Sequence, residues 1–285
     1  MTISPWLDAL HPRRLFLDTW REVDAEARLL RTASPTRAYD FRPLLALAVG
    51  AVCLLLMAHF GTSRYFFTLL ETMPTDGGGA RAAIAASPWR DLAAMTWWSG
   101  WRVLCYAVIP AMLIRFAWRE RVRDFGLGTA GFARHAGLYA AAYLVALACI
   151  ALVAFTDTRF TAYYPMYRLA ARSWADLLAW EALYIAQFFA LEFFFRGFWL
   201  NALRPSLGSQ AIFVMVVPYA MIHIGKPLPE AFAAIVAGIF LGTLAMKTRS
   251  IWGGFLIHGA VALSMDIAAL LATRGLPDRW WPASG

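Results

Sequence analysis

The chain has 285 residues, of which 60% are hydrophobic and only 15% are charged. Soluble globular domains are about 45–50% apolar and about 25% charged, so this composition excludes an ordinary soluble domain. The net charge of +8 does not indicate nucleic-acid binding, because the arginines are scattered in loops between apolar runs, where they act as topology signals.

Residues 1–42 form a polar, Arg-rich N-terminal segment. Apolar side chains recur within it every three or four residues and predict an amphipathic helix: Phe16, Trp20, Val23, Ala27 and Leu30. Such a helix lies at the membrane interface or against the bundle, and a solvated helix of modest amphipathicity is the alternative. No cleavable signal peptide is expected, because the first apolar run of sufficient length begins near residue 43.

Residues 43–285 are predicted to form a single all-α, polytopic transmembrane domain. Apolar runs near the roughly 20 residues needed to cross a bilayer define seven predicted spans: 43–60, 98–117, 136–155, 175–200, 210–225, 229–247 and 250–273. A long irregular connection with a Gly-Gly-Gly run separates the first two predicted spans. Alternatively, this connection contains an eighth, poorly apolar membrane segment around residues 80–95. The expected range is therefore six to eight spans.

The distribution of Lys and Arg predicts the orientation. If the N-terminus is cytoplasmic, most basic loop residues fall on the cytoplasmic side, as the positive-inside rule requires. In the span 229–247, Gly238 and Gly242 are four residues apart, a spacing that lets two helix backbones approach closely.

Ionisable residues inside membrane spans are costly and usually mark a functional site. Those inside or close to the predicted spans are Arg102, Glu181, Glu192, Arg196, His223, His258 and Asp266.

Glu192 and Arg196 are four residues apart in the stretch ALEFFFRGFWL, so their side chains share one helix face. Glu181 lies eleven residues before Glu192, on nearly the same face. That face must point into protein or water. A structural ion pair between Glu192 and Arg196 is the simpler interpretation.

Glu192, His223 and His258 fall at comparable depths on three different spans. At 1.5 Å per residue they lie roughly 13, 20 and 13 Å from the cytoplasmic ends of their helices. A shared polar cavity within the membrane is therefore predicted. One glutamate and two histidines can form a zinc site, but no HExxH sequence is present.

Water activation without a cofactor is the favoured chemistry of this set. A carboxylate takes a proton from water, a histidine steers the water or protonates the leaving amine, and a second histidine donates to the oxyanion. These steps describe peptide hydrolysis without a covalent intermediate.

The same residues resemble three motifs of the CAAX protease and bacteriocin-processing family, also called the abortive-infection family. Glu192 to Gly197 resembles the first motif, two adjacent Glu, three residues and Arg, commonly followed by Gly. Tyr219 to His223 resembles the second, an aromatic residue four before a His. His258 resembles the third, a His usually followed four residues later by Asn. The resemblance covers the protease-like core at residues 175–273.

The resemblance implies an intramembrane endopeptidase of glutamic type. Glu192 and His223 would activate water, His258 would donate to the oxyanion, and Arg196 would position Glu192. Two positions depart from the motifs: the first Glu is Leu191 and the Asn is Ala262. Glu181 and Asp266 are the nearest polar substitutes and are predicted to support the site.

The predicted activity is hydrolysis of a membrane-associated peptide or protein tail in a bacterial inner membrane. Membrane lipids and a peptide substrate are the expected partners, and neither a cofactor nor nucleic acid is expected. A catalytically inactive peptide-binding or bacteriocin-immunity protein is the alternative, and a transporter that uses the charges as a relay is a third interpretation.

Overall fold

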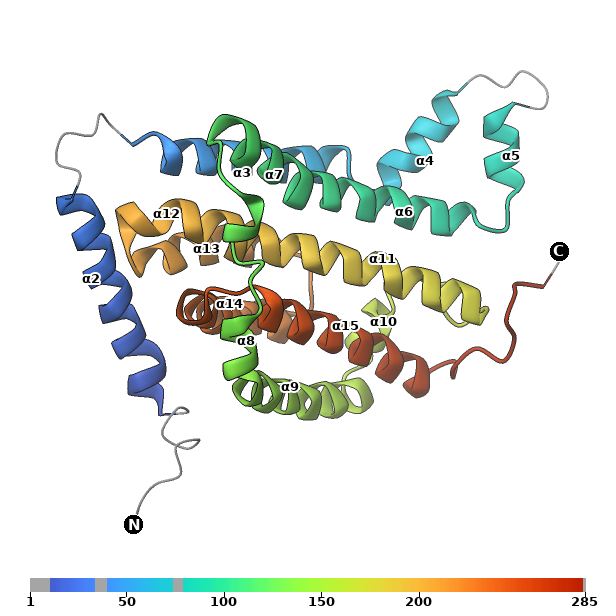
Figure 1. The fold of residues 1–285 in the computed structure, drawn as a ribbon. Helices are drawn as coiled ribbons and strands as arrows, with labels where there is room; N and C mark the ends of the chain where they lie inside the picture. Colours follow the sequence, from blue (N-terminus) through green and yellow to red (C-terminus); the bar gives the residue numbers. More distant parts are fainter. Residues whose placement is uncertain (1–10, 34–39, 74–78, 284–285) are drawn as a thin grey trace, which may run out of the picture. The chain divides into compact units, whose positions relative to one another are not determined.

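The computed structural model describes residues 11–33, 40–73 and 79–283, and their regular secondary structure is helical. Six helical stretches are long and apolar enough to cross a membrane (Figure 1): Arg42–His59, Arg90–Ala117, Ala136–Thr156, Trp174–Leu207, Leu228–Thr248 and Trp252–Ala272. The prediction of an all-α polytopic bundle is confirmed.

The predicted span 210–225, the fifth along the chain, is shorter than expected. The structure has the helix α13 there, Gln210–Met221, with 12 residues. At 1.5 Å per residue it rises about 18 Å, less than the roughly 30 Å of a bilayer core. The helix ends at Met221, and the turn that follows contains Gly225 at a φ of 92° and leads to Pro227, the N-cap of the next helix.

The second span begins earlier than predicted, at Arg90, and the expected segment around 80–95 is not a separate span. It divides into the short helix α5, Ala80–Ala86, and the first turns of α6, Arg90–Val103. The fourth span also continues beyond its predicted end, to Leu207. The shorter remaining helices are α4 (Ser63–Thr72), α7 (Ile109–Met112), α8 (Ala130–Arg134) and α10 (Thr158–Tyr163).

The span Trp174–Leu207 is the most buried of the six. Over half of its most apolar window, 56%, is inside the protein, against 22–33% for the others. It consists of α11 (Trp174–Glu192), a π-helical segment (Phe193–Trp199) and α12 (Leu200–Leu207). A polar residue in this span therefore lies against protein.

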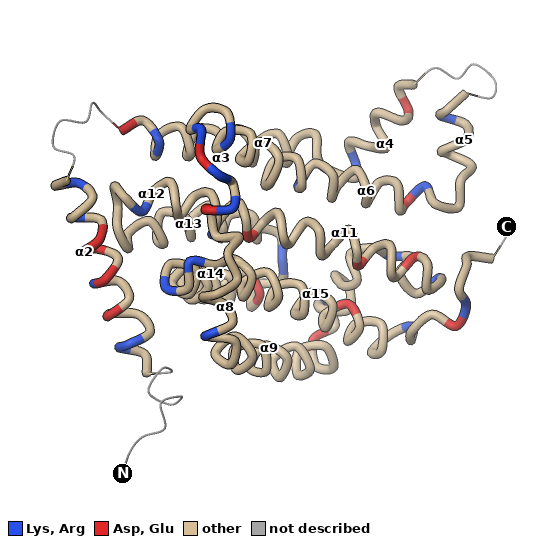
Figure 2. Tube along the Cα trace, viewed as in Figure 1, with Lys and Arg blue, Asp and Glu red and all other residues tan. Residues whose placement is uncertain are grey.

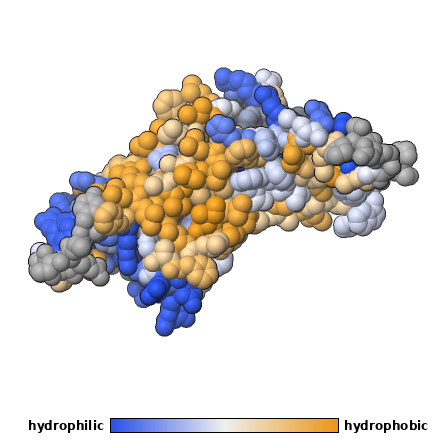
Figure 3. Space-filling view, turned by 90° about the horizontal axis from the view of Figure 1, so that it is seen from above, coloured by the Kyte–Doolittle hydropathy of each residue, from blue (hydrophilic) through white to orange (hydrophobic). Residues whose placement is uncertain are grey.

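The other spans expose large apolar side chains, as lipid-facing helices do. On α9, Ala136–Thr156, these are Leu144, Val145, Leu152 and Phe155. Apolar residues dominate the central part of the face seen in Figure 3. Charged residues lie mainly along α2 and in the connections and end turns of the apolar helices (Figure 2).

The chain divides into two compact units. The first comprises Met1–Ala51, Pro110–Ala142 and Glu192–Ile257, and the second Val52–Ile109, Tyr143–Leu191 and His258–Gly285. In the first unit, α13 packs on α14, Leu228–Thr248, where a Cβ on Gly238 would lie 3.1 Å from the Tyr219 ring and one on Gly242 3.0 Å from Met215. The predicted role of these two glycines in close helix packing is confirmed.

The N-terminal helix α2, Thr19–Thr32, also belongs to the first unit. Val23 and Ala27 are buried, and Trp20 donates a hydrogen bond to Thr243 of α14 (3.0 Å). Val23 and Ala27 of the predicted apolar stripe therefore lie against the helices of this unit, one of the two interfacial placements predicted from the sequence, whereas Leu30 is 46% exposed.

The second unit has its own apolar core, built around Trp180, Tyr184 and Tyr167. Ser99 of α6 donates a hydrogen bond to the carbonyl of Leu183 in α11 (2.8 Å). Arg102 lies over the Trp98 ring at 3.8 Å and donates to the carbonyl of Gly61. The structure thus gives Arg102 a packing role within the span Arg90–Ala117.

Candidate active site

Glu192 is the last residue of α11 and is fully buried. Its Oε1 lies 3.0 Å from Nη1 of Arg196, and neither side chain is exposed to any extent. The spacing of four residues predicts this pair, which the structure confirms. Two oppositely charged side chains are tolerated in a buried position only when they are paired, so Glu192 and Arg196 stabilise each other.

The helix changes geometry directly after Glu192. Residues Phe193–Trp199 are π-helical, a rare conformation that is frequent at functional sites. Gly197 explains why the turn tolerates close packing, because a Cβ there would lie 2.7 Å from the carbonyl oxygen of Phe125. The glycine that follows the arginine thus admits another backbone beside the ion pair.

Arg196 makes a second contact, with Tyr219 of α13. Its guanidinium carbon lies 4.2 Å from the centre of the Tyr219 ring, within cation–π range. Tyr219 is itself buried and packs on Phe195, with ring centres 5.3 Å apart. The ion pair therefore packs against α13 through the contact of Arg196 with Tyr219.

His223 lies just after the end of α13 and is half-buried. Its Nδ1 is 2.7 Å from the backbone oxygen of Tyr219. Because a carbonyl oxygen only accepts, Nδ1 must donate, which leaves Nε2 as the acceptor of the neutral ring. The rings of Tyr219 and His223 also touch, with centres 4.9 Å apart. Contacts therefore run from Glu192 through Arg196 and Tyr219 to His223.

Gly254 is a site residue that the sequence analysis missed. A Cβ at this position in α15, Trp252–Ala272, would lie 2.2 Å from Oε2 of Glu192. The neighbouring Gly253 would in turn meet the ring of Tyr139 at 2.1 Å. A glycine pair inside an apolar helix, four residues before His258, was the available signal.

His258 belongs to the second unit, as do Glu181 and Asp266. The His258 ring stacks on Phe188, with centres 5.5 Å apart and an angle of 5° between the planes. Asp266 accepts a hydrogen bond from Nε1 of Trp180 (2.6 Å), and the buried carboxyl of Glu181 lies close enough to Asp266 for the two acids to interact electrostatically. The structure therefore brings these two acids together in one buried cluster.

Leu191 and Ala262 occupy the two positions at which the chain departs from the motifs. Both are buried, and Ala262 packs in the apolar core that contains Trp180 and Tyr184. Among the residues that the structure describes, no group of three or more His, Cys, Asp or Glu side chains is arranged to hold a metal ion. The zinc alternative and the expected absence of a cofactor remain predictions from the sequence.

The fold and these contacts define a multi-pass helical membrane protein that buries an acid, a guanidinium group and an aromatic–histidine pair in apolar surroundings. Residues 171–264 match the family model described as Type II CAAX prenyl endopeptidase Rce1-like. This segment, about a third of the chain, contains Glu192, Arg196, His223 and His258, and the match supports the resemblance of this part of the chain to the CAAX protease family. No curated protein and no solved structure matches the chain.

Proposed function

We propose that this protein is a glutamic-type intramembrane endopeptidase that hydrolyses a membrane-associated peptide or protein tail. The observation that supports this best is the Glu192–Arg196 pair, fully buried within the segment that matches the Rce1-like family. A charged pair in the most buried span is costly, and a structural role alone would be served as well by apolar packing.

Glu192 acts as the base in this proposal. Its carboxylate accepts a proton from water, and the water oxygen attacks the carbonyl carbon of the scissile peptide bond. Arg196 positions Glu192 and supplies the opposite charge that makes an ionised carboxylate tenable in these surroundings. With Leu191 in place of the first acid, Glu192 is the only carboxylate of the motif.

The two histidines act on the other atoms of the reaction. His223 Nε2, the acceptor nitrogen, steers the water, then takes from Glu192 the proton that was removed from this water and passes it to the leaving amine as the carbon–nitrogen bond breaks. His258 donates a hydrogen bond to the oxyanion of the tetrahedral intermediate. This assignment requires His258 to meet Glu192 and His223 around one water molecule.

Glu181 and Asp266 have a supporting role in the proposal. Their buried cluster with Trp180 joins α11 to α15 within the second unit. The remaining parts of the proposal concern location: a bacterial inner membrane, with a cytoplasmic N-terminus. The excess of Lys and Arg in the segments assigned to the cytoplasmic side supports this orientation.

The test is cleavage of a membrane-associated peptide that has a fluorophore and a quencher on either side of the scissile bond, by the full chain in liposomes. The variants Glu192→Gln, His223→Ala and His258→Ala should each abolish turnover. His59→Ala is a matched control, because Nδ1 of the exposed His59 makes the same local contact, 3.0 Å from the oxygen of Leu55. Glu71→Gln, at an exposed position, controls for loss of a carboxylate.

Two outcomes contradict the proposal. Full activity of Glu192→Gln would remove Glu192 as the base. Peptide binding by the wild-type chain without hydrolysis, unaffected by Glu192→Gln, would favour a peptide-binding protein.

A further inference from the structure

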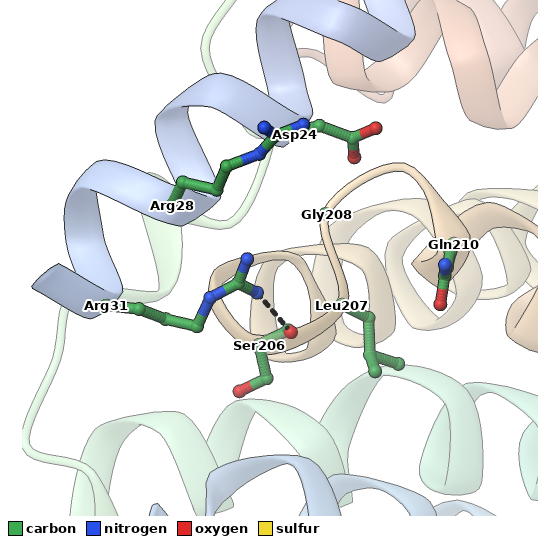
Figure 4. Close-up of a pocket in the computed structure, with 7 residues that line it drawn as sticks. All are labelled: Asp24, Arg28, Arg31, Ser206, Leu207, Gly208 and Gln210. Carbon is green, nitrogen blue, oxygen red and sulfur yellow. Dashed lines mark hydrogen bonds between the residues drawn. The ribbon is translucent and has the colours of Figure 1, made fainter.

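A cavity of about 240 Å³ lies where α2 faces the turn between α12 and α13 (Figure 4). It is lined by Asp24, Arg28 and Arg31 of α2 and by Ser206, Gly208 and Gln210 of the turn. All of these residues belong to the first unit. The volume holds several water molecules at about 30 Å³ each, so a small polar group fits.

The acidic side chains of α2 near the cavity have partners of their own. Asp24 Oδ1 accepts a hydrogen bond from the backbone N–H of Ser209 (2.7 Å). Glu26 forms ion pairs with Arg204 (3.8 Å) and Arg249. The charge of Glu26 is therefore paired, and Asp24 leaves one negative charge in the cavity beside the two arginines.

The two arginines of the cavity are left with excess positive charge. Arg28 and Arg31 are three residues apart, so they share a face of α2, and both are exposed. Arg31 donates to the carbonyl oxygen of Ser206 (2.6 Å), which adds no negative charge, and within the described ranges neither arginine has a carboxylate at ion-pair distance. The positive end of the 12-residue helix α13 begins at Gln210, on the same cavity.

The position of the cavity indicates where its ligand comes from. Ser206 and Leu207 end the span Trp174–Leu207, so the cavity lies at a membrane surface. Leu29 and Leu30, between the two arginines, are 70% and 46% exposed. Exposed leucines beside arginines at the end of a membrane span are typical of contact with the acyl and headgroup regions of a lipid.

We propose that this cavity binds the headgroup phosphate of an anionic membrane phospholipid. The guanidinium groups of Arg28 and Arg31 pair with the phosphate oxygens, and Leu29 and Leu30 contact the acyl chains. A zwitterionic headgroup fits less well, because its ammonium group meets the same two positive charges. The bound lipid would fix α2 against α12, independently of any peptidase activity.

The test is calorimetric titration of the detergent-purified full chain with short-chain phosphatidylglycerol. The wild type should bind at one saturable site, and Arg28→Gln/Arg31→Gln should raise the Kd by about tenfold or more, since each lost charge-assisted pair costs on the order of 1 kcal/mol. Arg28→Lys/Arg31→Lys retains the charge and should fall between the two. Arg21→Gln is the matched control on α2, because Arg21 already pairs with Asp18 at 3.5 Å.

Three results would overturn the proposal. They are equal affinity for short-chain phosphatidylcholine, tighter binding of inorganic phosphate than of the lipid, and an unchanged Kd in Arg28→Gln/Arg31→Gln. The second result would identify the cavity as a site for a soluble phosphate compound.

Discussion

Gly254 lies directly beside the carboxylate of Glu192, so close that a Cβ atom would come within 2.2 Å of Oε2. Gly254 lies in the first turn of α15, which begins at Trp252, and the glycine at this position has a steric reason. The reason is the space that Glu192 occupies.

Gly254→Ala is therefore expected to lower peptide cleavage strongly, by about 100-fold, since an ångström-scale misplacement of a catalytic group can cost that much. Helix propensity alone would make the substitution stabilising. Gly259→Ala is the matched control in the same helix, because its Cβ would meet only Ile185, at 4.0 Å. Cleavage by Gly254→Ala at the wild-type rate would show that the position of the Glu192 carboxylate is not critical.

Removing Arg196 should lower the stability of the protein more than removing one residue of an exposed ion pair. Arg196→Met leaves the buried Glu192 unpaired, and such changes cost about 3–5 kcal/mol in stability. Adding Glu192→Gln to the same chain should recover much of that loss, although not the activity. Thermal unfolding of the single and double variants measures the coupling.

The ion pair between Arg42 and Glu120 is the exposed reference for the buried pair of Glu192 and Arg196. Its charged atoms are 2.7 Å apart, and its side chains are 42% and 34% exposed. Arg42→Gln should cost less than about 1 kcal/mol, because water screens exposed pairs. Equal losses from Arg196→Met and Arg42→Gln would mean that the Glu192 carboxylate is not held as a buried charge.

A third prediction concerns the helix contact that holds Tyr219. A Cβ on Gly238 would already lie 3.1 Å from the Tyr219 ring, so Gly238→Leu must push α13 away from α14. Activity should fall, because Tyr219 contacts both Arg196 and His223. Gly100→Leu is the control, since a Cβ there would meet nothing within 4 Å. If Gly238→Leu cleaves peptide normally, the placement of Tyr219 does not limit catalysis.

The long helices and the ion pair could be predicted from the sequence because each depends on local pattern. Uninterrupted apolar runs of membrane length have few alternatives to a helix, since the backbone must satisfy its own hydrogen bonds in lipid. Glu192 and Arg196 are neighbours on an α-helix, because their spacing is four residues.

Other features depend on tertiary packing and could not be predicted in the same way. Hydropathy does not distinguish the 12-residue α13 from a full span, because its residues are as apolar as those of a span. The π-helical turn after Glu192 and the close approach of Gly254 arise from contacts with distant segments. Convergence of His258 with Glu192 and His223 stays a prediction, because His258 belongs to the second unit.

Glu181 offers a test of whether the second acidic cluster is structural. Glu181 is buried close to Asp266, and an amide in its place carries no charge to repel Asp266 and has an N–H that can donate to it. Glu181→Gln should therefore retain both stability and turnover. By contrast, Trp180→Phe removes the donor 2.6 Å from Asp266 and should cost about 1–3 kcal/mol. Loss of turnover in a stable Glu181→Gln protein would instead mean that Glu181 takes part in the reaction, and Glu192 would no longer be sufficient as the base.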